Sequence, residues 1–377
     1  MAVNRKKGLE QLKKQLSDGS LSMLSEQPPR QVLSTGIATL DSALGVGGLV
    51  RGQQVIFYGP PDGGKSALAY TAAGNLMMRD SEAMVCIVDI ERSANPDWLA
   101  KFGIDPERTV VIKEPTIEES VNAFQQAMRS CSFDYIIIDS LGAVIRANDF
   151  DGKDGKGGDA NKAQVGGAAG VITRWVNKAN AELISLDKQE LVGTEVIKPV
   201  IIFINQVRDN FNSMYGGLTM PGGHALRHMS KTIIRVTASG AANDKMFGTV
   251  NGKRVQVGTR VTCKVERNKN APDGRLAGYD FCWEECPEFA FGIDSVAACY
   301  DLTVEYGVIE TRGAWCYYGE QGEPGFVKAN GRSAMLDLLR DNPEFFEEVY
   351  SKTMDAVSRR NDDEMAEIAA KEVPIDA

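Results

Sequence analysis

The sequence predicts an α/β fold: a doubly wound and mostly parallel sheet with antiparallel edge strands. Its strongest apolar runs are continuous rather than alternating, as in strands covered on both faces, and helical stretches separate them. The second observation is the segment Gly59–Ser66, GPPDGGKS, which fits the phosphate-binding pattern G-x-x-x-x-G-K-[ST] and stands between a strand and a helix.

A short basic helix is expected at residues 3–17, ahead of the core. Leu9, Leu12 and Leu16 recur at helical spacing and form one apolar stripe. Either a neighbouring subunit or the chain's own core could cover that stripe. We assign residues 1–33 to an N-terminal helix and linker that contacts another subunit.

The core is expected at residues 34–289. Its predicted helices are Ile37–Leu44, Ser66–Met78 and Ser120–Ser130, and its predicted buried strands are Gln54–Tyr58, Met84–Asp89, Thr109–Lys113, Tyr135–Asp139 and Pro199–Asn205. Later runs are shorter and more mixed, which indicates antiparallel edge strands at Thr232–Thr237, Arg254–Val257 and Arg260–Glu266.

The remainder is predicted to form a small α+β C-terminal domain at 290–345 and an acidic tail at 346–377. We expect the last fifteen or so residues to lack regular structure. Residues 341–377 contain 11 acidic and 4 basic side chains, a net of −7, so the rest of this chain of net charge −9 is near −2. An acidic end on a nearly neutral body is compatible with a nucleic-acid partner.

The composition predicts a soluble cytoplasmic protein with no membrane partner. The chain has 377 residues, 43% of them hydrophobic and 25% charged. Its apolar runs are too short to span a bilayer, and the basic N-terminus lacks the apolar segment of a secretory signal. Seven scattered cysteines fit a reducing compartment.

The glycine-rich segment predicts a nucleotide site with ATP and Mg²⁺ as cofactors. Its backbone amides and the following helix N-terminus would cradle phosphate oxygens. Lys65 would reach the terminal phosphates, and the Ser66 hydroxyl would hold Mg²⁺. The residues expected at the phosphates are Gly59, Pro60, Pro61, Asp62, Gly63, Gly64, Lys65, Ser66 and Ala67.

Three polar side chains end predicted parallel strands, where the chemistry of such sheets gathers. Asp139 closes the run YIIID and is placed to hold the Mg²⁺ shell. Glu91 follows the strand ending at Asp89 and could polarise a water against the terminal phosphate; an ordinary surface acid is the alternative. Gln206 follows the fifth strand, and its amide could touch that phosphate and report its presence.

Two long loops, 148–166 and 208–223, are candidate binding segments. Both are rich in glycine, and the second carries Phe211, Met214 and Tyr215. Long loops of this kind are usually functional or disordered. Solvated surface loops are the alternative.

Several stretches together resemble the bacterial RecA recombinases. They are LSTGIATLDSALGVGGLVRG, GPPDGGKS, VDIERSANPDWLAKFGID, YIIIDS, IIFINQVR, PGGHALRHMS, RVTCKVERNKNAP, GAWCYYG and KANGRSAMLDLLRDNPE, in the family's order over roughly residues 5–345. The resemblance implies a DNA-dependent ATPase that forms helical filaments on single-stranded DNA. Such a filament pairs that strand with a homologous duplex and exchanges strands in recombination, DNA repair and the SOS response to DNA damage.

The resemblance also implies residue roles at the nucleotide. Lys65 and Ser66 match the phosphate and Mg²⁺ ligands, and Asp139 matches the second Mg²⁺ carboxylate. Glu91 matches the catalytic carboxylate and Gln206 the ATP-sensing amide.

Further matches concern the base and the subunit interface. Trp98 falls where the family stacks an aromatic ring on adenine, and Asn95 falls near the adenine edge, where the family has an acid. Arg267 and Lys269 match the lysines that reach ATP across the subunit interface.

Loops 148–166 and 208–223 match the family's two DNA-binding loops. The implied partners are single-stranded DNA, a homologous duplex, further copies of the chain, and single-strand-binding or loading proteins. The residues expected to bind DNA are Gln164, Gly166, Arg208, Asn210, Phe211, Asn212, Ser213, Met214, Gly216, Gly217, Gly222 and Gly223.

Departures from the family pattern indicate a diverged member, for which a viral origin stays open. Ser66 replaces the usual Thr, His228 stands where the family has an aromatic residue, and the first loop carries an insertion rich in Gly, Lys and Asp. A ring-forming helicase with the same core is one alternative. A filament acting mainly as a scaffold for repressor self-cleavage is another.

Overall fold

The computed structural model describes residues 5–143, 167–209, 218–219 and 223–371. Its centre is a ten-stranded sheet in the order β14-β13-β12-β10-β3-β7-β6-β4-β5, with β11 paired to β12. Strands β10, β3, β7, β6, β4 and β5 are parallel, and β11 to β14 pair antiparallel. The predicted mostly parallel α/β sheet is therefore confirmed.

The parallel strands lie close to the predicted runs. They are β3 (Gln54–Gly59), β4 (Val85–Asp89), β5 (Thr109–Ile112), β6 (Tyr135–Asp139), β7 (Val200–Gln206) and β10 (Thr232–Ala238). All but β5 and the far end of β10 are almost fully buried. Val110 and Val111 of β5 are exposed because β5 is an end strand of the sheet.

The antiparallel part departs from the prediction. Thr232–Thr237, predicted as an antiparallel edge strand, lies in β10, which pairs in parallel with β3 and stands inside the sheet. Arg254–Val257 and Arg260–Glu266 belong to one strand, β12 (Lys253–Asn268), not two, and β12 lies inside the sheet between β10 and β13 rather than at its edge. Gly258 lies within this strand, at a position where only glycine fits. A Cβ there would collide with the carbonyl oxygen of Phe281 on β13. Three described strands of this sheet were not predicted: β11 (Lys245–Val250), β13 (Leu276–Cys282) and β14 (Gly292–Ile293).

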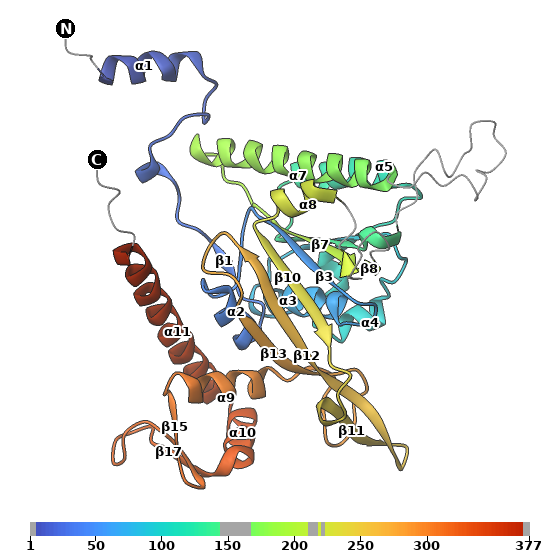
Figure 1. Cartoon of the computed structure of the whole chain (residues 1–377), viewed down its shortest axis with the longest axis vertical. Helices are drawn as coiled ribbons and strands as arrows, with labels where there is room; N and C mark the ends of the chain where they lie inside the picture. Colours follow the sequence, from blue (N-terminus) through green and yellow to red (C-terminus); the bar gives the residue numbers. More distant parts are fainter. Residues whose placement is uncertain (1–4, 144–166, 210–217, 220–222, 372–377) are drawn as a thin grey trace, which may run out of the picture.

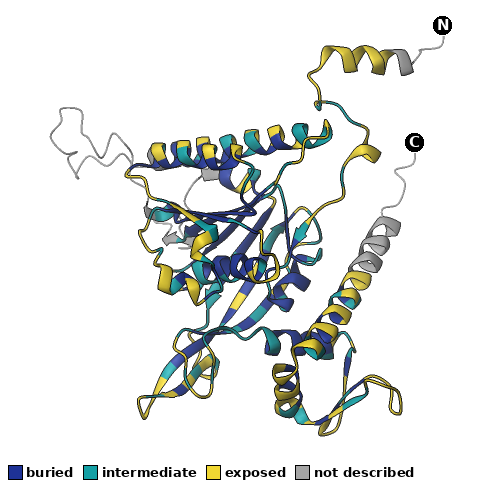
Figure 2. Ribbon diagram, turned by 180° about the vertical axis from the view of Figure 1, so that it is seen from behind, coloured by how far each residue is buried: buried dark blue, intermediate teal, exposed yellow. Residues whose placement is uncertain are grey.

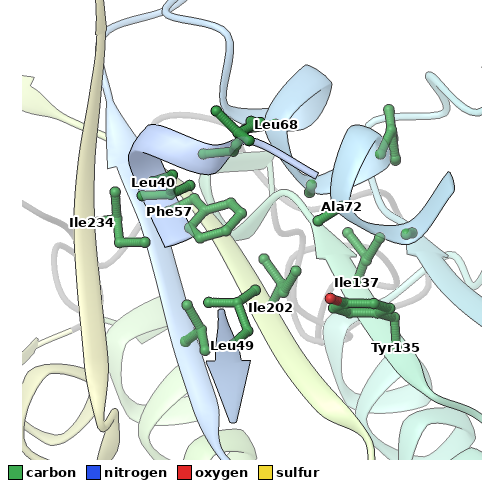
Figure 3. Close-up of a cluster of buried hydrophobic side chains, with 14 of the residues drawn as sticks. Leu40, Leu49, Phe57, Leu68, Ala72, Tyr135, Ile137, Ile202 and Ile234 are labelled. Atoms are coloured by element: carbon green, nitrogen blue, oxygen red, sulfur yellow. The ribbon is translucent and has the colours of Figure 1, made fainter. Parts of the chain in front are cut away.

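Helices cover both faces of the sheet, as Figures 1 and 2 show. Alternation along β3 sends Val55 and Phe57 into the cluster under the first pair of helices, and Ile56 into the cluster under the second set. Figure 3 shows the first cluster. The first pair is α2 (Ala38–Leu44) and α3 (Lys65–Arg79), and the second set is α5 (Ile117–Arg129), α7 (Gly167–Leu191) and α8 (Gly223–Met229).

Helix α5 begins three residues before its predicted start. The Thr116 hydroxyl accepts from the backbone N–H of Glu119 at 3.3 Å and donates to the Glu119 carboxylate at 2.7 Å. This N-cap satisfies the first turn and lets the helix include Ile117. The remaining short elements are η1 (Leu24–Glu26), β1 (Val32–Leu33), β2 (Leu49–Val50), α4 (Pro96–Ala100), η2 (Pro106–Arg108), η3 (Leu141–Ala143), β8 (Arg208–Asp209), β9 (Leu218–Thr219) and η5 (Ala242–Asp244).

The C-terminal part packs a small sheet against helices. Its elements are α9 (Ser295–Glu305), β15 (Ile309–Arg312), β16 (Trp315–Tyr318), β17 (Val327–Asn330), α10 (Gly331–Asp341) and α11 (Pro343–Lys371). The predicted lack of regular structure over the last fifteen residues is wrong up to Lys371, because α11 runs on as one helix. Buried Val349, Thr353 and Val357 hold its first half against the body.

Helix α1 (Arg5–Gln15) lies close to its predicted range and stands away from the body (Figure 1). Leu9, Leu12 and Leu16 are 38%, 43% and 42% exposed. The chain's own core therefore leaves this stripe uncovered. Within the described ranges, no helix combines the length and apolarity needed to cross a membrane.

Candidate nucleotide site

The predicted phosphate loop and catalytic side chains meet at the carboxyl ends of β3, β4, β6 and β7. A cavity of about 390 Å³ opens there. Its wall is formed by Pro61, Asp62, Gly63, Gly64, Lys65, Ser66, Ala67, Glu91, Trp98, Asp139, Ser140, Ile204, Gln206, Phe281 and Trp283.

The phosphate loop links the end of β3 to the start of α3. A Cβ on Gly59 would collide with the carbonyl oxygen of Val236 on β10, so only glycine lets the loop leave the sheet here. Gly64, the residue before the helix, has φ 88°, in the left-handed region. The N-terminal amides of α3 therefore open onto the cavity, where they can receive an anion.

Lys65 is buried in its own loop. Its Nζ donates to the carbonyl oxygen of Pro60 at 2.5 Å. Burial lowers the pKa of Lys65, while the nearby carboxylates of Asp139, Glu91 and Asp62 act in the raising direction. A phosphate bound in the loop would offer the ammonium a charged acceptor, which forms a stronger hydrogen bond than a carbonyl.

Asp139, at the end of β6, meets the requirements of a Mg²⁺ carboxylate. Burial raises its pKa, and hydrogen bonds from Tyr70 and Ser66 oppose that shift. The Tyr70 hydroxyl donates to Oδ2 at 2.8 Å, whereas the buried Oδ1 has no hydrogen-bond partner within the described part of the chain. An unpartnered carboxylate oxygen beside the Ser66 hydroxyl suits a hard cation with oxygen ligands.

Glu91 is held by a tight turn after β4. The backbone N–H groups of Ile90 and Glu91 donate to the carbonyl oxygen of Asp139 at 2.8 and 3.2 Å. The Asp89 carboxylate accepts from the N–H groups of Ser93 and Ala94 at 2.9 and 3.1 Å. The turn is thus fixed at both ends, and it places the Glu91 side chain on the cavity wall.

Two side chains donate to the same oxygen of Glu91. Nε2 of Gln206 lies 3.2 Å from Oε1, and the hydroxyl of Ser140 donates to it as well. Gln206 ends β7, so this contact joins the end of one strand to the turn that follows another. Ser140, like Tyr70, was not predicted; the only sequence signal for it is its place directly after Asp139 in YIIIDS.

Trp98 and Asn95 have different surroundings. The Trp98 ring lines the cavity and packs edge-on against Phe102 and Phe291, with ring centroids 5.2 and 5.3 Å apart. The Asn95 side chain caps α4, accepting from the N–H groups of Asp97 and Trp98 at 2.9 and 3.3 Å. The wall of the cavity, as the described residues form it, does not include Asn95. It does include Trp283, for which the sequence held no signal.

Arg267 and Lys269 are not part of the cavity wall that the described residues form. The Arg267 guanidinium donates to the carbonyl oxygens of Arg227 and His228, at 2.7 Å from Nη1 and 3.4 Å from Nη2. These carbonyls lie in the last turn of α8, so Arg267 stabilises the end of that helix. Lys269 has an exposed side chain and a backbone N–H that donates to Lys231.

Most residues expected to bind DNA lie outside the described ranges. They are Gln164, Gly166, Asn210, Phe211, Asn212, Ser213, Met214, Gly216, Gly217 and Gly222. Arg208 lies in β8, directly beyond β7, and Gly223 begins α8. The second loop is therefore bounded by the strand that carries Gln206 and by the helix that Arg267 holds.

Comparisons with known proteins agree with this arrangement. The family model described as the RecA N-terminal domain matches residues 4–286. A "Protein RecA" of Frankia casuarinae is 31% identical over 358 residues, covering 93% of this chain and 92% of the relative. A "Protein RecA" of Thermus thermophilus is 30% identical over 362 residues, covering 94% and 96%.

A solved structure described as the RadB recombinase is 21% identical, with a TM-score of 0.47, covering 69% of this chain and 98% of that one. The sequence matches show the family. They extend over almost the whole chain and include the phosphate loop and the strand ends that line the cavity. The chain therefore belongs to the family of RecA-type recombinases.

Proposed function

We propose that this protein is a DNA-dependent ATPase that assembles as a helical filament on single-stranded DNA, pairs that strand with a homologous duplex and catalyses strand exchange. The observation that carries the proposal is the meeting of Lys65, Glu91, Asp139 and Gln206 around one cavity, in a chain that belongs to the RecA family. Its setting is recombination and DNA repair in the cytoplasm, with single-strand-binding or loading proteins as further partners.

The chain's own residues supply binding and proton transfer. The amides at the start of α3 and the Lys65 ammonium hold the phosphates of ATP. The Glu91 carboxylate, oriented by Gln206 and Ser140, accepts the proton of the attacking water. Mg²⁺, held by Ser66 and Asp139, would neutralise charge on the phosphate oxygens.

Gln206 connects the nucleotide to the DNA. Its amide touches Glu91 at one end of β7, and the chain runs from there into the segment 208–223 that is expected to bind DNA. A terminal phosphate would compete with Glu91 for the amide donor. Binding of DNA and the position of the catalytic base are thereby coupled.

The test is ATP hydrolysis by the full chain with and without single-stranded DNA. We expect DNA to raise the turnover number by at least an order of magnitude, with Lys65→Ala inactive under both conditions. Electron microscopy of the same mixtures should show open helices. Closed rings would favour the helicase alternative. An equal rate of ATP hydrolysis with and without single-stranded DNA would refute the proposed function.

A further inference from the structure

The antiparallel part of the sheet ends in a two-stranded ribbon formed by β11 and the first half of β12. Strand β12 pairs with β10 only from Val261 onward, and its residues 253–259 pair with β11. Asn251 and Gly252 join the two strands with φ values of 51° and 73°, as in a tight hairpin turn. Figures 1 and 2 both show the ribbon projecting beyond the helical layers.

The ribbon is braced at one point along its length. The Glu288 carboxylate accepts from the backbone N–H of Thr249 at 3.1 Å and from its hydroxyl at 2.9 Å. These hydrogen bonds lower the pKa of Glu288 to about 2. Gly248 leaves room for Cys286, which a Cβ at that position would hit. The ribbon therefore has a fixed shape and keeps its tip clear of the body.

The ribbon is basic although the chain is acidic. Residues 245–260 contain four basic side chains and no acidic one, in a chain of net charge −9. Lys245, Lys253 and Arg254 are exposed, whereas Arg260, at the base, lies 3.4 Å from Asp280. Two apolar side chains, Phe247 and Val255, are 43% and 38% exposed between the cations.

Carboxylates lie both at the base of the ribbon and beside its outer end. Asp244 is bonded to Ser239 at 2.5 Å, and Glu288 is bonded to Thr249. Glu284 and Glu285 are exposed on the same bracing segment. Lys253 and Arg254 lie next to the turn, with Arg254 paired to Thr249 and Lys253 one step further out. Glu288 is engaged by Thr249, opposite Arg254, whereas the tip itself, residues 250–254, contains two cations and no acidic residue.

The ribbon leaves the sheet at the edge from which the expected DNA-binding segments also leave. Strand β10 is parallel to β3, β3 to β7, and β7 to β6. Their carboxyl ends therefore share one edge. The segment 144–166 follows β6, the segment 208–223 follows β7, and the ribbon follows β10.

We propose that the β11–β12 ribbon binds the phosphate backbone of duplex DNA. A two-stranded ribbon fits the major groove of B-DNA, which is about 12 Å wide. Lys245, Lys253 and Arg254 then contact phosphates, with Phe247 and Val255 between them. The identity of the duplex as the strand-exchange partner rests on the proposed function; the binding surface itself rests on the ribbon's charge, shape and place.

The test compares the parent with Lys253→Gln/Arg254→Gln. Both side chains are exposed, so folding should be unaffected, which circular dichroism checks. Anisotropy of a labelled duplex is measured over a salt series, with the free chain and with the chain preassembled on unlabelled single-stranded DNA. The parent should lose affinity steeply with salt, and the variant's log–log slope should be smaller by about 2, since each phosphate contact contributes about 0.9.

A matched control is Arg129→Gln/Lys188→Gln, which neutralises two cations of the helical layer on α5 and α7; its slope should equal that of the parent. An unchanged slope in the ribbon variant overturns the proposal. A loss of assembly in sedimentation, with duplex affinity intact, also overturns it and identifies a second copy of the chain as the ribbon's partner.

The same samples separate this inference from the proposed function. ATP hydrolysis stimulated by single-stranded DNA should be equal in the parent and in Lys253→Gln/Arg254→Gln, because the ribbon variant leaves the cavity untouched. If the parent itself lacks that stimulation, the proposed function fails. The salt dependence of duplex affinity, measured with the free chain, still tests whether the ribbon binds duplex DNA.

Discussion

At the residue scale, Glu91 is the side chain on which the proposed hydrolysis depends most. Its turn is fixed by backbone hydrogen bonds to Asp139, and its Oε1 is shared by Gln206 and Ser140. A side chain on a fixed turn, with two hydrogen bonds to one of its oxygens, loses little conformational freedom when substrate arrives, which is the preorganisation that acid–base catalysis needs. The same hydrogen bonds would survive replacement of the carboxylate by an amide, because an amide oxygen can accept both of them.

Glu91→Gln should therefore bind ATP as the parent does but hydrolyse it about 10²–10⁴-fold more slowly, since an amide cannot accept a proton from water. Binding would be followed with a fluorescent ATP analogue and hydrolysis by phosphate release. Asp97→Asn, at an exposed acid on α4, serves as the control and should keep the parent rate. Turnover by Glu91→Gln at the parent rate would show that another group takes the proton.

Sequence reasoning at this scale predicted the positions of residues that belong to one local pattern. Lys65 and Ser66 belong to one loop whose spacing already determines their geometry. Ser140 and Trp283 line the cavity, and Tyr70 donates to Asp139, from different parts of the chain, so only the tertiary structure shows them. Asn95 was expected near adenine, yet its oxygen caps α4, a use that the sequence Asn-Pro-Asp would have allowed.

At the element scale, the buried carboxylate of Asp41 joins the core to the C-terminal part. Asp41 on α2 accepts from Ser34, from the Thr35 amide and hydroxyl, and from the Tyr350 hydroxyl of α11 at 2.6, 2.9, 2.7 and 3.2 Å. Burial raises its pKa from 3.8 to about 6, although these hydrogen bonds act in the lowering direction. The junction is thus sensitive to protonation.

The sign of that sensitivity follows from linkage. Between pH 4 and 6 the folded chain keeps a proton on Asp41 that the unfolded chain has lost, so the contribution of Asp41 to stability is largest below pH 4. It should fall by about 3 kcal/mol as the pH rises to 6, because each unit of pKa difference is worth 1.36 kcal/mol. Urea unfolding of the parent and of Asp41→Asn from pH 4 to 7 measures this, and a constant difference between them would contradict it.

Helix α11 is the second element with a testable role. Truncation after Arg360 keeps buried Val357 and the pairing of Arg360 with Glu305 at 3.6 Å, and removes six acidic residues and one basic residue, a net of −5. We expect faster binding to duplex DNA at low salt, with the gain lost near 1 M salt, where screening shortens to about 3 Å. Stopped-flow anisotropy would follow this. An equal rate at low salt would show that the tail does not shield the DNA.

Elements with a strong period were predicted within a few residues, whereas β12 and β13 were not. Residues 261–265 of β12 alternate between buried and exposed side chains, whereas residues 253–260 do not. The pattern therefore did not indicate one continuous strand. The two predicted strands left out Gly258 and Thr259, yet glycine at position 258 is required by the close approach of β13. Helix α11 was underestimated because its polar end has no apolar stripe to predict it.

At the scale of the whole molecule, two features fit the proposed filament. The leucine stripe of α1 is exposed, and Arg267 and Lys269 are not on the cavity of the subunit that carries them, as far as the described residues define its wall. Both fit an assembly in which one subunit covers α1 of the next and completes its nucleotide site. An Arg at 267 could bridge two phosphate oxygens, whereas Lys269 would act as a point charge.

Mixing two inactive variants tests this assembly. Arg267→Ala/Lys269→Ala lacks the cations and Lys65→Ala lacks a working phosphate loop, so mixed filaments should contain some complete sites and recover part of the ATPase activity. A Lys65→Ala/Arg267→Ala/Lys269→Ala partner is the control and should restore nothing. Failure of every mixing ratio, with co-assembly demonstrated by pull-down, would place the cations outside the reaction.

Strand β12 connects the ribbon to the centre of the sheet. Its 16 residues run without interruption from the ribbon tip to Asn268, a length of roughly 50 Å at the usual rise of an extended chain. Asn268 is anchored to the carbonyl of Leu44 at 2.8 Å, next to Arg267. Strand β12 is hydrogen-bonded to β10 and β13 along its inner half, and β13 carries Phe281 on the wall of the cavity, so the ribbon and one wall of the nucleotide site belong to one continuous sheet.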